Sequence, residues 1–104
     1  MNKLEQKIKF PEKITIGTKV FKVIHNKEEG GEFNWQTGVL RICDGKDYLS
    51  TLNLIFHEIF EMWSVALYLR YTRPDTFDCY EFHFDHKDFT NLCELSAKTI
   101  SEFL

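Results

Sequence analysis

The sequence has little of what marks several classes of protein. Its 104 residues include only two prolines and five glycines, and they contain no low-complexity tract and no internal repeat. Hydrophobic residues make up 43% and charged residues 28% of the chain, which is the composition of a folded globular domain. We therefore expect residues 1–104 to form one small domain around a single core.

Cysteine is scarce, and its spacing matches no common framework. The three residues Cys43, Cys79 and Cys93 are an odd number and form no C-x-x-C pair. This argues against a disulfide scaffold and against a four-cysteine zinc site. The first residues also lack the apolar segment of a signal peptide. We therefore expect reduced thiols and a cytoplasmic location.

No long hydrophobic stretch of the sequence lacks charged residues. Residues 49–69 nearly reach the length of a membrane span, but Glu58 and Glu61 would lie near its centre. Each of them would cost on the order of 3 kcal/mol there, and the segment offers no partner charge. The sequence therefore predicts no transmembrane helix and no membrane partner.

Positive charge is not concentrated in a way that suits nucleic acid. The formal net charge is −3; residues 1–27 hold seven lysines against two glutamates, whereas residues 75–104 hold seven acidic residues against two lysines. A broad nucleic-acid surface needs a concentrated cationic face. We therefore expect no nucleic-acid partner.

The first part of the chain has the pattern of β-strands. Residues 13–25 are rich in β-branched and aromatic residues around a break at Gly17. Residues 31–42 show the same pattern around a turn at 36–38. Each stretch is typical of two short strands joined by a tight turn. The sequence therefore predicts a small antiparallel sheet of three to four strands.

Two helices are predicted after the strands. Apolar spacing favours a helix over 51–71, capped by Ser50 and ended before Pro74, because the residue before a proline disfavours helical backbone. A second helix begins at Asp85, with Asp88 three positions later as in a capping box. The expected fold is therefore α+β, with the sheet and two packed helices forming two layers.

The segment HEIFE, residues 57–61, places three titratable groups inside the apolar first helix. At 100° per residue, His57 and Glu61 lie about 40° apart, with Glu58 roughly 60° beyond Glu61. Four further residues, Ser50, Asn53, Ser64 and Tyr68, fall near the same polar stripe. The remaining circumference is predicted to face the core, and its apolar residues are Leu52, Ile55, Phe56, Ile59, Phe60, Met62, Trp63, Ala66, Leu67 and Leu69.

Two interpretations of this polar stripe are open. It could face water, as the polar side of any amphipathic helix does. However, it contains no lysine or arginine between Ser50 and Arg70, whereas solvated helix faces usually carry both signs of charge. An imidazole and a carboxylate four residues apart can bind one divalent ion. Further ligands would have to come from residues after the helix: Cys79, Glu81, His83, Asp85 or His86.

The motif and the order of elements carry a resemblance to a known family. H-E-x-x-E resembles the H-E-x-x-H signature of the zincin metallopeptidases, with a glutamate at the position of the second histidine. A strand-rich first part, this helix, and a histidine opening a final helix in FDHKDF are together similar to short zincin-like proteins encoded in bacterial and phage genomes. The resemblance covers most of the chain from Ile14 onward.

The resemblance implies a role for each matching residue. His57 and His86 would be imidazole ligands, Glu61 a carboxylate ligand, and Glu58 the general base for a metal-activated water. Zinc is the expected ion, and the additional carboxylate would also suit manganese or another divalent ion. His83 remains open as a rival to His86, and Cys79 as a further ligand.

The expected function is a metal-dependent hydrolase that acts on a peptide bond. By resemblance, the strand at 38–42 would hold the substrate as an added strand. Tyr68, Tyr71 or Tyr80 could stabilise the developing oxyanion. The alternative, from another class, is a non-catalytic zincin-like scaffold that binds a protein partner, with or without metal.

Overall fold

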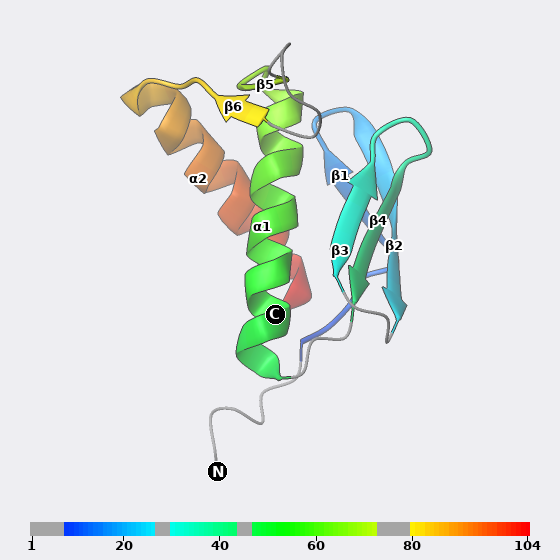
Figure 1. Cartoon of the computed structure of the whole chain (residues 1–104). Coiled ribbons are helices and arrows are strands. Elements are labelled where there is room, and N and C mark those ends of the chain that lie inside the picture. The colour runs from blue at the N-terminus through cyan, green and yellow to red at the C-terminus, as the bar shows by residue number, and fades with distance from the viewer. Residues whose placement is uncertain (1–7, 27–29, 44–46, 73–79) are drawn as a thin grey trace.

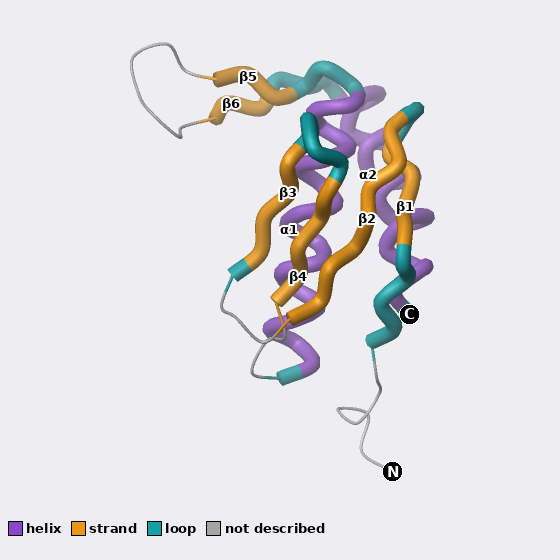
Figure 2. Tube along the Cα trace, turned by 90° about the vertical axis from the view of Figure 1, so that its right-hand side faces the viewer, coloured by secondary structure: helices purple, strands orange, loops and turns teal. Residues whose placement is uncertain are grey.

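The computed structural model describes residues 8–26, 30–43, 47–72 and 80–104. It confirms the α+β class, because two helices cover one face of a four-stranded sheet (Figures 1 and 2). The elements in chain order are β1 (Lys13–Ile16), β2 (Lys19–Asn26), β3 (Gly31–Asn34), β4 (Val39–Cys43), α1 (Tyr48–Ala66), β5 (Arg70–Thr72), β6 (Tyr80–Phe82), α2 (His86–Ile100) and a closing 3₁₀ turn (Ser101–Phe103).

The sheet is mixed, so the prediction of a purely antiparallel sheet was wrong in one pairing. The strand order is β1-β2-β4-β3, and the two outer pairings are antiparallel. The central pairing of β2 with β4 is parallel, with Val23 opposite Leu40. Because β4 is paired on both sides, residues 38–42 cannot take an added substrate strand, and that expectation was wrong. The edge beside α1 is β3 instead.

The core lies between the sheet and the helices. Strand β1 alternates exposed and buried residues, so that Ile14 and Ile16 face the helices. Other sheet residues on this face are buried too, as are the facing residues of the helices. The remaining members of the core cluster are Phe21, Leu40, Ile42, Ile55, Ile59, Met62, Trp63, Leu92, Ile100 and Phe103. Burial of these side chains is the main force that holds the two layers together.

Helix α1 begins and ends earlier than predicted. Its cap is Asp47, whose Oδ1 accepts a hydrogen bond of 2.8 Å from the backbone N–H of Ser50. At the other end, Tyr68 takes a left-handed backbone with φ of 61°. The N–H of Leu69 then donates to the carbonyl of Ser64, which closes the helix end in a turn. The chain therefore leaves the helix after Ala66 and continues into β5.

The start of α2 is as predicted. Asp85 is the cap, its side chain accepts from the N–H of Asp88, and the Asp88 side chain accepts from the N–H of Asp85. This reciprocal capping box fixes the direction in which α2 leaves β6. Deeper in the bundle, Trp63 Nε1 donates a buried hydrogen bond of 2.9 Å to Thr99 Oγ1. This bond joins α1 to α2.

A helix that crosses a lipid bilayer needs about 20 predominantly apolar residues. Within the described part of the chain, no helix is both long enough and apolar enough to cross it.

Candidate functional site

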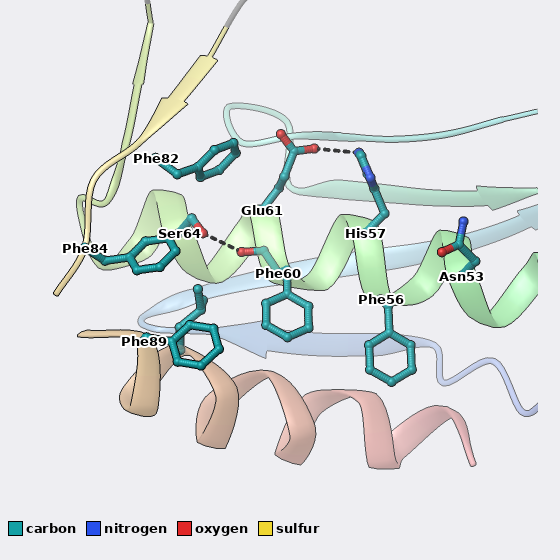
Figure 3. Close-up of a pocket in the computed structure, with 10 residues that line it drawn as sticks. Asn53, Phe56, His57, Phe60, Glu61, Ser64, Phe82, Phe84 and Phe89 are labelled. Atoms are coloured by element: carbon teal, nitrogen blue, oxygen red, sulfur yellow. Dashed lines mark hydrogen bonds and ion pairs between the residues drawn. The ribbon is translucent and has the colours of Figure 1, made fainter. Parts of the chain in front are cut away.

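One group of side chains on α1 has the residue types and the spacing that could hold a metal ion. His57, Glu58 and Glu61 each offer a ligand atom, and these atoms all lie within 4.8 Å of one another. His57 Nε2 is 3.0 Å from Glu61 Oε2 (Figure 3). The same nitrogen is 3.7 Å from Glu58 Oε2. The spacing of one and four residues on a helix brings the three together, as the sequence predicted. We call these residues the His-Glu-Glu group.

Glu58 is the buried member of the group. Its side chain is 6% exposed, whereas the His57 side chain is 63% exposed. Burial raises the pKa of Glu58 from its ordinary value of 4.5 to about 7; His57 opposes this shift and Glu61 adds to it. A Cβ added at Gly31 would lie 3.6 Å from Cγ of Glu58. The aliphatic part of the Glu58 side chain therefore packs directly against edge strand β3.

Glu61 also has an arginine partner that the sequence did not reveal. Arg70 Nη1, from β5, lies 3.5 Å from Glu61 Oε1, and both side chains are about one-fifth exposed. The guanidinium lies 4.0 Å from the ring centroid of Tyr80 and 5.4 Å from that of Phe33. Arg70 thus links α1, the β5–β6 hairpin and edge strand β3. No local pattern could have indicated this contact, because it depends on where the hairpin folds back.

An open groove of about 470 Å³ begins at the same side chains. It lies along α1 and is closed on one side by β6 and the start of α2 (Figure 3). Four of its phenylalanines are between 41% and 45% exposed, including Phe56, which was predicted to be core. We call this the aromatic groove, and its lining residues are Asn53, Phe56, His57, Phe60, Glu61, Ser64, Phe82, Phe84, Phe89 and Leu92.

The structure does not bring the two later histidines into the His-Glu-Glu group. His86 is the first residue of α2 and is exposed. His83 is exposed as well; its Nε2 lies 3.3 Å from Glu81 Oε2, and its ring packs edge-on against Tyr71 at 5.2 Å. The helix group and either later histidine are therefore separate in this conformation.

The three candidate tyrosines have different surroundings. Tyr68 is 82% exposed and lines a different cavity, beside Gly17 and Trp35. Of the other two tyrosines considered, Tyr71 lies against His83 and Tyr80 lies under Arg70. The structure thus does not place Tyr68 at the His-Glu-Glu group. Cys79 lies outside the described residues.

The donor chemistry fits a divalent ion. One imidazole nitrogen with carboxylate oxygens is a set that zinc accepts and that harder ions such as manganese also accept. Arg70 approaches Glu61 through Oε1, while Oε2 is the oxygen that faces His57. The buried carboxylate of Glu58 would gain most from a nearby cation, because burial disfavours its charged form.

Comparisons with known proteins identify no family for this chain. No protein-family model, no curated protein and no solved structure matches it.

Proposed function

We propose that the protein is a metal-dependent hydrolase of peptide bonds, as the zincin-like H-E-x-x-E motif suggests. The observation that carries the proposal is the convergence of three donor groups within 4.8 Å at the mouth of an open groove. Convergent donor groups beside an open pocket, one of them a buried carboxylate with a raised pKa, are a general mark of an active site.

The chain's own residues would divide the work as follows. His57 and Glu61 would hold the ion, and Arg70 would orient Glu61 through its second oxygen. When bound, the ion would polarise both the attacking water and the substrate carbonyl. Glu58 would accept the proton of the water and give it to the amine nitrogen as the carbon–nitrogen bond breaks. His86 remains the predicted further ligand.

The strand that would hold the substrate is β3. Among the described residues it is an edge strand, so one row of its backbone groups pairs with no other strand of that part of the chain. It passes over Glu58 at Gly31, where an added Cβ would lie 3.3 Å from the carbonyl oxygen of Arg41 and 3.6 Å from Cγ of Glu58, so a larger residue there would crowd this side chain. A peptide added to this edge would have its backbone next to the His-Glu-Glu group.

Metal content and hydrolysis test the proposal separately. Untagged protein loaded with zinc should retain about one ion per chain by elemental analysis, and His57→Ala should lose it. Glu58→Gln should keep the ion but no longer hydrolyse a mixture of quenched fluorescent peptides. A wild-type protein that binds no ion, or a Glu58→Gln variant as active as wild type, would refute the proposal.

The same measurement decides between the later histidines. Loss of zinc in His86→Ala would support His86 as a ligand. Retention in His86→Ala together with loss in His83→Ala would assign that role to His83. If both variants keep the ion, the helix group holds it without either residue.

The alternative, a non-catalytic scaffold that binds a protein partner, is favoured by one observation. The aromatic groove exposes several large apolar side chains, as protein interaction sites often do. In this case Glu58→Gln should leave partner binding unchanged, and no peptide in the mixture should be cleaved.

A further inference from the structure

The aromatic groove and the His-Glu-Glu group share two side chains. His57 and Glu61 belong to both, so a molecule in the groove would lie within contact of the proposed metal ligands. Glu58 points instead toward β3. The group therefore has an edge strand on one side and the groove on the other.

The lining of the groove is apolar over its centre and polar at one rim. Phe56 and Phe60 stack with ring centroids 6.2 Å apart, and Phe84 and Phe89 stack at 5.8 Å. Every phenylalanine of the described residues that is more than 40% exposed lines this groove. Such clustering is unlike the scattered apolar residues of an ordinary surface, and it indicates a binding site.

The size and the polarity of the groove suit one large side chain. A volume of about 470 Å³ falls in the lower part of the range of small-molecule sites, roughly 300–1,000 Å³. The polar lining residues, including Asn53 and Ser64, lie on the α1 side together with the metal-binding candidates. An occupant with an apolar end and a polar backbone would match both parts.

We infer that the aromatic groove is a subsite for a large apolar side chain, aromatic or branched aliphatic, of a peptide whose backbone crosses the His-Glu-Glu group. A peptide fits better than a free apolar molecule because the outer edge of β3, which pairs with no strand among residues 8–26, 30–43, 47–72 and 80–104, offers backbone hydrogen bonds on the opposite side of the group. Cleavage of the bound peptide rests on the proposed function, whereas its binding does not.

Binding can be tested without metal. The probes are N-acetyl-Gly-Trp-Gly-amide and N-acetyl-Gly-Ala-Gly-amide, titrated into metal-free protein while backbone amide signals are followed by NMR. The tryptophan peptide should shift signals of α1 and α2 around Phe60 and Leu92. The alanine peptide should bind about tenfold more weakly or worse, since it lacks the large apolar side chain.

Variants locate the site. Phe56→Ala and Phe89→Ala remove half-exposed rings, so the fold should survive while affinity for the tryptophan peptide falls about tenfold. Leu49→Ala is the matched control, because Leu49 is 61% exposed on the same helix and does not line the groove. Equal binding of both peptides, or full affinity in both groove variants, would overturn the inference. Self-association that shields the same amides would also overturn it, since a second copy would then be the occupant.

Cleavage separates this inference from the proposed function. Zinc-loaded protein given a mixed peptide library should cut at bonds with a large apolar residue at one fixed position, and Phe89→Ala should weaken that preference. Cleavage without any such preference would overturn the subsite. Specific binding of the tryptophan peptide without any cleavage would support the subsite and count against the hydrolase.

Discussion

Replacing Glu58 by glutamine should make the metal-free protein more stable at neutral pH. The Glu58 side chain is 6% exposed, and burial raises the pKa of its carboxyl from 4.5 to about 7. A shift of this size corresponds to about 3 kcal/mol of preference for the neutral form in the folded state. Glutamine has nearly the same shape but carries no charge, so the variant avoids this cost.

The sign follows from proton linkage. The folded protein holds the proton of Glu58 more tightly than the unfolded chain, so the wild-type carboxyl does not reduce stability below about pH 4.5. Between pH 4.5 and about pH 7 the unfolded chain loses this proton first, and wild-type stability falls. The advantage of Glu58→Gln should therefore grow by about 3 kcal/mol across this window and stay constant above it. Any cost of burying the amide is the same at every pH and does not affect this slope.

Urea unfolding of chelator-treated protein at several pH values measures the difference directly. Glu94→Gln, an exposed glutamate on α2, is the control and should run parallel to wild type. A difference between wild type and Glu58→Gln that does not change from about pH 5 to pH 8 would refute the reasoning. It would mean that Glu58 is hydrated in solution and that its burial against β3 is not maintained.

Three further predictions concern the parts of the fold that support the site. Trp63→Phe removes the indole N–H that donates a 2.9 Å hydrogen bond to Thr99, so the free energy of unfolding should fall by about 1 kcal/mol. If urea unfolding gives the same free energy for the variant and wild type, this hydrogen bond does not stabilise the fold. Asp47→Ala should lower the melting temperature at neutral pH, because hydrogen bonds from Ser50 lower the pKa of Asp47 below 3.8; the loss should shrink as the pH falls through that value, and a loss that is constant with pH would count against the cap. Arg70→Lys should lower the free energy of unfolding by about 1 kcal/mol in thermal unfolding, because lysine has no planar guanidinium to stack on the Tyr80 ring. An Arg70→Lys protein as stable as wild type would show that this stacking contributes nothing.

Local chemistry predicted the features that depend on near neighbours in the sequence. The capping box of Asp85 and Asp88 starts α2 where the sequence indicated, because a cap needs only a side chain and the next turn. The stripe on α1 was also predicted, since helical periodicity alone fixes which residues share a face. Asn53, His57 and Glu61 do line one groove.

Features that depend on tertiary partners were not predicted. Helix α1 ends at Ala66 with no glycine at Tyr68, where the backbone is left-handed, so the usual sequence signal for a helix end is absent. The parallel pairing of β2 with β4 was missed because alternation shows which face of a strand is buried but not which strand lies beside it. Phe56 was placed in the core because it is apolar, but it lines an open groove.

The choice of His86 as a ligand also depended on tertiary packing, which the sequence pattern does not give. A spacing of four residues fixes the angle between two side chains on one helix, but the distance between residues on two helices depends on how the helices pack. The motif therefore brought His57 and Glu61 together correctly, while His86 on α2 does not join them in this conformation. Its role as a ligand stays a prediction for metal analysis.

The contact with Arg70 changes what the acidic stripe implies. The lack of basic residues within α1 suggested two carboxylates in need of a cation, but Arg70 already meets one oxygen of Glu61. Glu58 is different, because it is buried, and Arg70 lowers its pKa less than Glu61 or Glu32 raises it. The physical case for a bound cation therefore depends on Glu58 more than on Glu61.

If a divalent ion binds at the group, it should abolish most of the pH-dependent advantage of Glu58→Gln, because it offsets the cost of the buried charge. Adding zinc to the same urea experiment measures this directly, and an advantage that persists in zinc-loaded protein would place the ion elsewhere.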